Sequence, residues 1–207
     1  MTQPSAALSS KREKLRWEGP AAMLGGSLWL LFYGASALAG RELGEGPRDV
    51  NDSGLLLLGA AAFCGAVLSL GTSLTGLRAR LQGRARRLGL AGGVMAALAL
   101  ATAALNALLL TGLVGRARFA GGLAALGVLC VCTGAVLLGL ATRREQVLPR
   151  WGGTLLVVTG PLTVLLIATS GLRFGSIPGY VLDDLPFAIA GLSWITAGAA
   201  MRSRGEK

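Results

Sequence analysis

"GLLLLGAAAFCGAVLSLG", residues 54–71, contains no charged side chain and no regular alternation of polar and apolar residues. The charge-free run around it extends from residue 53 to residue 77. That run exceeds the roughly 20 residues that a helix needs to cross about 30 Å of hydrocarbon. A membrane β-strand would alternate over about ten residues. Because a helix satisfies its own backbone hydrogen bonds in lipid, this stretch predicts a transmembrane helix.

The same pattern recurs along the chain. Hydrophobic residues make up 53% of the sequence and charged residues 14%, against about 25% charged in ordinary soluble domains. The charge-free stretches are 19–40, 53–77, 88–115, 119–142, 151–172 and 185–201. Five are long enough to span, and the sixth reaches the lower limit. We therefore expect an all-α, polytopic integral membrane protein with six transmembrane helices.

The basic residues predict the orientation of this bundle. With a cytosolic N-terminus, fifteen of the twenty fall in inner segments. These are Lys11, Arg12, Lys14, Arg16, Arg78, Arg80, Arg84, Arg86, Arg87, Arg143, Arg144, Arg150, Arg202, Arg204 and Lys207. The positive-inside rule then favours both termini in the cytosol of a cell with an inner (plasma) membrane. Residues 1–18 and 202–207 become basic cytosolic tails around a bundle at 19–201, and the net charge of +10 is an orientation signal rather than a nucleic-acid footprint.

The first span has a second interpretation. "ASALAG", residues 35–40, has the small-x-small pattern of a signal-peptidase site, and cleavage after Ala39 would leave five helices. The apolar run before it is about 20 residues, longer than the 7 to 15 typical of a signal peptide. Retention of the first helix is therefore favoured.

Three similar sequence segments lie at the starts of the first, third and fifth spans. They are "LRWEGPAAMLGG" (15–26), "RRLGLAGGVMAA" (86–97) and "PRWGGTLLVVTG" (149–160). Arginine can reach the headgroups while tryptophan lies at the interface, so these segments could anchor the helix starts at the membrane surface. They divide the chain into three parallel two-helix hairpins at 16–80, 86–144 and 149–204. Internal duplication would explain this, but the tendency of arginine to gather at every inner helix end would explain it too.

Small residues indicate close helix packing. The chain has 32 glycines, which membrane helices use to bring their backbones together. Ala61, Gly65, Ser69 and Ser73 recur at four-residue steps and so share one helix face. This face could pack inside the bundle or between protomers, and packing inside the bundle is favoured.

Several classes of catalysis lack their residues. The chain has no histidine, and no predicted span contains an acidic or basic residue. His-ligated haem, zinc-protease helices and serine-histidine hydrolysis therefore have no ligands or bases here. We expect no cofactor and no metal, and the sequence does not favour an enzyme.

A ligand could be bound within the spans at two places. Asn106 is the most polar side chain in any span and could contact a ligand or hydrogen-bond a neighbouring helix. Thr159, Pro161 and Thr163 predict a kink in the fifth span, with the two hydroxyls rescuing freed carbonyls. Such breaks line substrate sites in some transporters. A structural role is favoured at both places.

Two charged clusters lie at the ends of the spans. Outside, Asp49, Asp52, Arg173, Asp183 and Asp184 could hold a headgroup or a metal, although helix capping and solvation are favoured. Inside, one loop carries five arginines that would attract anionic lipid by about 1 kcal/mol each near the surface. These are Arg78, Arg80, Arg84, Arg86 and Arg87.

Two late segments carry a resemblance. "VLPRWGGTLLVVTGPL" (147–162) and "LPFAIAGLSWITAGAAMRSR" (185–204) are similar to small, functionally uncharacterised multi-pass inner-membrane proteins of high-GC, actinobacteria-like bacteria. The resemblance covers about a third of the chain and implies a bacterial inner-membrane protein, without any catalytic residue to transfer.

Together these features favour a non-enzymatic accessory or structural partner in the cell envelope. Its partners would be membrane lipids, including anionic lipid at the cytosolic face, and a second copy or another membrane protein. The alternative is a transporter-like protein that binds a small apolar or lipidic ligand. An enzyme acting on lipid headgroups through the outer carboxylates is a third and weaker reading.

Overall fold

The computed structural model describes residues 17–44, 53–81, 83, 85–111, 120–169 and 182–203, which form helices and no strand. The helices are α2 (Glu18–Leu43), α3 (Gly54–Ala79), α4 (Arg86–Leu110), α5 (Ala120–Glu145), α6 (Arg150–Thr169) and α8 (Leu185–Ser203). All of these except α8 are long and apolar enough to cross a membrane. The prediction of an all-α, multi-pass membrane protein is confirmed.

Charged residues lie within several of these helices, near their ends. Helix α4 begins at Arg86, two residues before its charge-free stretch, and α5 continues through Arg143 and Arg144 to Glu145. A helix can extend beyond the hydrocarbon into the headgroup region, where charges are tolerated. The limits of charge-free sequence therefore locate the helices without fixing their ends.

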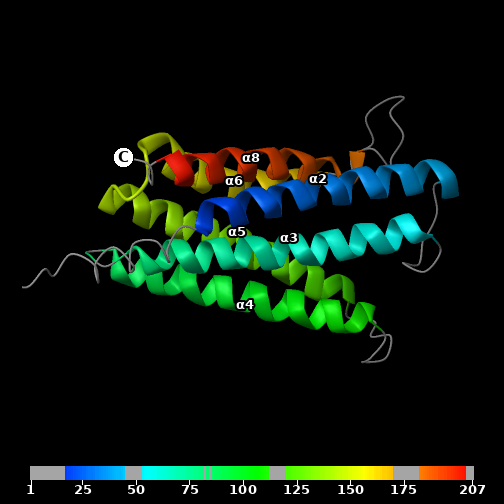
Figure 1. Ribbon diagram of the computed structural model, residues 1–207, viewed down its shortest axis with the longest axis horizontal. Coiled ribbons are helices and arrows are strands. Elements are labelled where there is room, and N and C mark those ends of the chain that lie inside the picture. The colour runs from blue at the N-terminus through cyan, green and yellow to red at the C-terminus, as the bar shows by residue number, and fades with distance from the viewer. Residues whose placement is uncertain are drawn as a thin grey trace, which may run out of the picture.

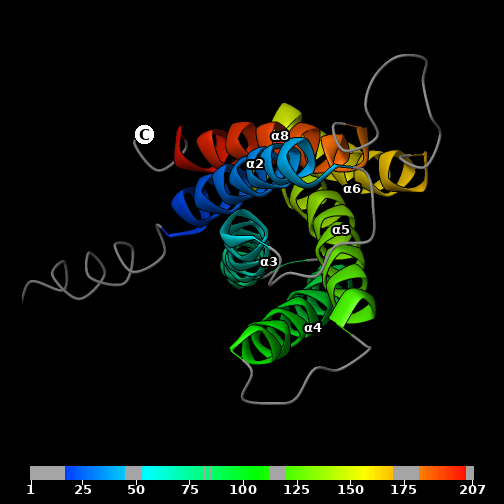
Figure 2. The same cartoon turned by 90° about the vertical axis from the view of Figure 1, so that its right-hand side faces the viewer.

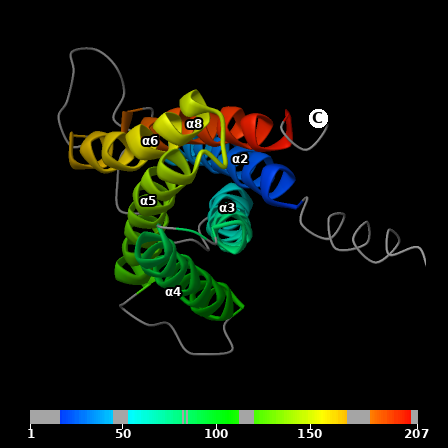
Figure 3. The same cartoon turned by 90° about the vertical axis from the view of Figure 1, so that its left-hand side faces the viewer.

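The six helices of the described residues form a closed ring. Each contacts the next along the chain, and α8 contacts α2. Helix α3 also contacts α5 across the ring. Figure 1 shows the helices running along one common direction, and Figures 2 and 3 look along it and show α3 between α2, α4 and α5.

The outside of the ring is apolar. Helix α4 exposes five large aliphatic side chains, with exposed fractions between 40% and 55%, and the other helices also expose leucine or valine. The five on α4 are Leu90, Val94, Leu98, Leu105 and Leu108. Such a surface suits the hydrocarbon of a membrane. Trp17 and Trp151 are exposed by 77% and 56% at the end where α2 and α6 begin, as expected of interface anchors.

Helices α2 and α8 touch through glycines. A Cβ added to Gly191 would lie 2.7 Å from the carbonyl oxygen of Gly26, and one added to Gly198 would lie 2.6 Å from that of Gly19. The glycines are seven residues apart on each helix, so both lie on one face. The two backbones are therefore in direct contact at two levels, and this contact closes the ring.

Helices α5 and α6 use the same arrangement. A Cβ on Gly139 would lie 3.0 Å from the carbonyl oxygen of Gly153, and one on Gly160 would lie 2.6 Å from that of Cys132. The spacing is again seven residues on each helix. The backbone of Cys132 thus lies directly against Gly160.

These contacts explain part of the similarity between the three segments 15–26, 86–97 and 149–160. In α2 and α6 the contact glycines follow the exposed tryptophan by two and nine residues. In α4, Gly92 and Gly93 instead face the side chains of Leu138 and Arg78. The glycine contacts join α2 to α8 and α5 to α6. Only the first of these pairs closes the ring, and neither is one of the three hairpins expected from the sequence. Internal duplication stays one of the two explanations left open by the sequence.

The small-residue face of α3 is only partly used inside the bundle. Ser73 is buried and Gly65 is half-buried against Leu28, whereas Ala61 is exposed. The buried part lies at the end of α3 that meets the start of α2.

Candidate functional site at the basic end

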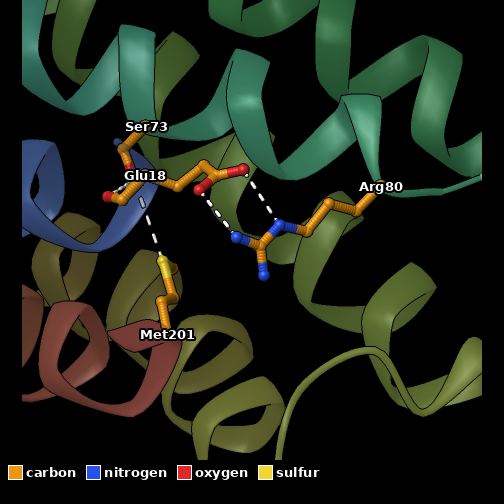
Figure 4. Close-up of polar contacts among 4 residues, drawn as sticks. All are labelled: Glu18, Ser73, Arg80 and Met201. Atoms are coloured by element: carbon orange, nitrogen blue, oxygen red, sulfur yellow. Dashed lines mark hydrogen bonds and ion pairs between the residues drawn. The ribbon is translucent and has the colours of Figure 1, made fainter. Parts of the chain in front are cut away.

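The end of the bundle where α2, α4 and α6 begin and α3, α5 and α8 end is rich in arginine, and we call it the basic end. A buried carboxylate joins α2 to α3 there. Glu18 is 4% exposed, and its two oxygens accept hydrogen bonds from Arg80 Nε at 2.9 Å and Nη2 at 2.8 Å. Ser73 Oγ donates to the Glu18 carbonyl oxygen at 2.8 Å and lies 3.9 Å from Met201 Sδ (Figure 4). Gly76 leaves the space for the Glu18 side chain, because a Cβ there would collide with it. The ion pair therefore links the first turn of α2 to the residue directly after α3.

A second carboxylate holds the loop between α3 and α4. Glu145, at the end of α5, accepts hydrogen bonds at Oε1 from the backbone N–H groups of Gly83 and Ala85, both at 3.0 Å. Charge-assisted bonds of this kind are stronger than neutral ones. The Glu145 carboxylate thus binds α5 to the segment that connects α3 with α4.

The arginines at this end outnumber the carboxylates. In the described part of the basic end, Glu18 and Glu145 are the acidic residues, and both are used within the protein as above. The described arginines there are Arg78, Arg80, Arg86, Arg87, Arg143, Arg144, Arg150 and Arg202. All except Arg80 are exposed. Most of this positive charge is available to groups outside the protein.

The arginines predicted to contact anionic lipid now fall into distinct places. Arg78, Arg86 and Arg87 are exposed, and Arg84 lies outside the described residues. Arg80 is bound to Glu18 and has a side chain only 26% exposed. Its main partner is therefore inside the protein.

The residues predicted to bind a ligand occupy two separate places. Asn106 is buried on α4, and Thr159 and Thr163 are buried on α6. Both helices pack on α5, and their described parts do not contact each other. Pro161 is exposed on the outside of α6. The structure does not combine these residues into one site.

The hydroxyls near Pro161 bond within their own helix. Thr159 Oγ1 donates to the Leu155 carbonyl and Thr163 Oγ1 to the Thr159 carbonyl, each at 2.7 Å. The carbonyl that Pro161 deprives of its helical donor belongs to Val157. The two hydroxyls thus donate to carbonyls one turn earlier in the helix and not to that of Val157. The expectation that they would donate to the carbonyl freed by Pro161 is wrong.

The outer acidic residues are described in part. Helix α8 begins directly after Asp184, whose carbonyl oxygen accepts from Phe187 N at 3.0 Å. The Asp184 carboxylate accepts a hydrogen bond from Ser36 Oγ of α2. Asp183 precedes it, and Asp49, Asp52 and Arg173 lie outside the described residues. Among described residues, no three His, Cys, Asp or Glu side chains gather as a metal-binding group.

An aromatic cluster packs the interior nearer the end where α2 ends and α8 begins. Phe187 of α8 contacts Trp29 and Phe32 of α2 and Phe63 of α3, with ring centroids 5.1 to 5.8 Å apart in edge-to-face geometry. Phe32 and Phe63 also contact each other. The cluster joins α2, α3 and α8. The glycine contacts and the Glu18–Arg80 pair join the same three helices nearer the basic end.

Sequence reasoning missed the Glu18–Arg80 pair. Glu18 stands one residue outside the first charge-free stretch, so it looked like part of a solvated tail. The available signal was Trp17, which marks the interface and so places the next residue at the membrane boundary.

Fold and site together define a class: a multi-pass, all-helical membrane protein whose described helices pack through close glycine contacts, an aromatic cluster and a buried carboxylate that pairs with an arginine. Comparison with protein-family models, curated proteins and solved structures finds no match to this chain.

Proposed function

We propose that this protein is a non-enzymatic accessory or structural component of a bacterial inner (plasma) membrane, with both termini in the cytosol. The observation that carries the proposal is the use of small residues inside the bundle. At Gly19, Gly26, Gly139 and Gly160 the backbones of neighbouring helices leave no room for a side chain. Such close contact at these four glycines leaves no space for a ligand there, and so it supports a function performed by the outer faces and the basic end of the bundle.

The buried polar groups support the same proposal. The hydroxyls of Ser73, Thr102, Thr142, Thr159 and Thr163 all donate to backbone carbonyls. These donors stabilise the fold and are engaged before any ligand is considered. The transporter-like alternative has less support, because Asn106 and the threonine pair of α6 lie on helices that do not touch.

The cytosolic placement of the basic end rests on charge. The described residues of that end include eight arginines and two glutamates, and cytoplasmic loops carry an excess of basic residues. A C-terminal fusion to a fluorescent protein that folds only in the cytosol should fluoresce. A fusion to a phosphatase active only outside the cytosol should be inactive. The reverse pattern would contradict the orientation.

The accessory role is tested by photo-crosslinking in the native membrane. A photoreactive side chain would be placed in turn at Leu31 of α2, Leu98 of α4 and Leu165 of α6, which are exposed on different helices. The buried Leu70 is the matched internal control. The proposal predicts one defined polypeptide adduct from one face and none from Leu70. Adducts to lipid alone from all three faces would contradict it.

A further inference from the structure

Three arginines pack against a glycine near the start of a neighbouring helix. They are Arg202 on Gly19, Arg143 on Gly153 and Arg78 on Gly93. A Cβ on Gly19 would lie 3.5 Å from Arg202 Cβ, and one on Gly153 would lie 2.7 Å from Arg143 Cγ. On Gly93 the nearest atoms are Cδ, Nε and Cζ of Arg78, with Nε at 2.7 Å. In this third contact the charged end of the side chain itself lies over the glycine.

The position of Gly93 along the bundle follows from its neighbours on α3. A Cβ on Gly71 would lie 3.4 Å from the Ala96 carbonyl oxygen, so the antiparallel register places Gly93 about three residues further on, beside Leu74. Ser73 bonds the carbonyl of Glu18 on the α2 side of the same turn. Gly93 and Glu18 therefore lie at one level of α3, the level marked by the exposed Trp17.

Tryptophan marks the interface between hydrocarbon and water, so the Arg78 guanidinium lies near the lipid headgroups. Arg78 is exposed, and no carboxylate of the described residues bonds it, since Glu18 binds Arg80 and Glu145 binds the loop. Arg86 precedes Gly93 by seven residues and so lies on the same face of α4. A planar guanidinium matches the oxygens of a phosphate and can donate two hydrogen bonds to it.

From this arrangement we infer that Arg78, held over Gly93 where α3 packs on α4, binds the phosphate of an anionic lipid. The inference narrows the general lipid contact expected of the inner arginines to one site. It depends on the placement of the basic end at the headgroups and is independent of the accessory role.

Binding is measured by native mass spectrometry of the full chain in detergent, titrated with phosphatidylglycerol or with phosphatidylcholine of the same acyl chains. The wild type should retain one phosphatidylglycerol in preference to phosphatidylcholine. Arg78→Gln should weaken that binding about tenfold or more, because charge-assisted hydrogen bonds are lost. Arg144→Gln removes the same charge from an exposed arginine at the same end of the bundle and should change this binding less than about twofold.

A second pair of variants tests the glycine. Gly93→Ala should displace the arginine side chain and weaken binding as Arg78→Gln does. Gly121→Ala, at a position with open space around it, should leave binding unchanged. The thermal unfolding midpoint of each variant shows whether it is folded.

Three results would overturn the inference. Equal weakening by Arg78→Gln and Arg144→Gln would indicate diffuse attraction to the basic end. Unchanged binding in Gly93→Ala would show that the contact between Arg78 and Gly93 has no part in lipid binding. Displacement of phosphatidylglycerol by inorganic phosphate at equal concentration would make this a site for small anions. Each of these results leaves the crosslinking test of the accessory role unaffected.

Discussion

Gly26 of α2 and Gly191 of α8 meet backbone to backbone, and a Cβ on Gly191 would lie 2.7 Å from the Gly26 carbonyl oxygen. The contact joins helices from opposite ends of the chain, and so it closes the ring. Its partner contact between Gly19 and Gly198 lies two turns nearer the basic end.

Gly191→Ala should therefore separate α2 from α8. The added methyl meets backbone, which cannot move aside as a side chain can, so we expect a loss of about 1–3 kcal/mol in stability. The measurement is the unfolding free energy in detergent or bicelles. Gly34→Ala on α2 is the control, because nothing lies within 4 Å of that position. Equal effects of the two substitutions would refute the close contact.

Gly160→Ala tests the corresponding contact between α6 and α5. The methyl would lie 2.6 Å from the Cys132 carbonyl oxygen, and overpacking of this kind again costs about 1–3 kcal/mol. Cys132→Ala keeps a small residue on the opposite helix and should be tolerated within about 1.5 kcal/mol. If Cys132→Ala were the more damaging of the two, the contact would depend on the thiol and not on size.

The Glu18–Arg80 pair predicts strong coupling in a double-mutant cycle. Arg80→Gln should cost about 3–5 kcal/mol, because it leaves the buried Glu18 carboxylate without its partner. Glu18→Gln should cost less, because the Arg80 side chain is 26% exposed and water can solvate it. The double variant should cost less than the sum of the two. Unfolding free energies of the four proteins measure this. Simple additivity would show that the two side chains do not depend on each other.

Glu145→Ala should loosen the loop between α3 and α4. The loss of two charge-assisted bonds to backbone N–H groups exposes the Gly83 and Ala85 amides to exchange. Hydrogen exchange at these amides should become faster by about tenfold or more, given about 1.5–3 kcal/mol for bonds to a charged group. Glu42→Ala, near the other end of the bundle, should leave them unchanged. Unaltered exchange in Glu145→Ala would contradict the anchoring role.

The sequence predicted the helices better than their contacts, and the reason is physical. Membrane thickness and backbone hydrogen bonding act on each segment alone, so charge-free stretches such as 53–77 locate helices directly. A glycine contact depends on two faces that meet. The spacing of Gly19 and Gly26 is visible in the chain, but its match to Gly191 and Gly198 requires knowing that α8 packs on α2.

The candidate site was predictable in composition and not in geometry. The cluster of arginines could be seen in the sequence. The burial of Glu18 and its ion pair with Arg80 depend on the space that Gly76 leaves, which the sequence does not show. Asn106 and Thr163 each looked suited to a ligand because polarity within a span is rare. Their separation on α4 and α6 follows from the position of α5 between these helices, which no local pattern encodes.

The most direct test of the central proposal, an accessory membrane protein, is native mass spectrometry of the wild-type chain extracted gently from its own membrane. The account predicts a complex in which a second polypeptide is present at fixed stoichiometry. A lone chain that retains one specific small molecule within its bundle would contradict the account and favour a ligand-handling function.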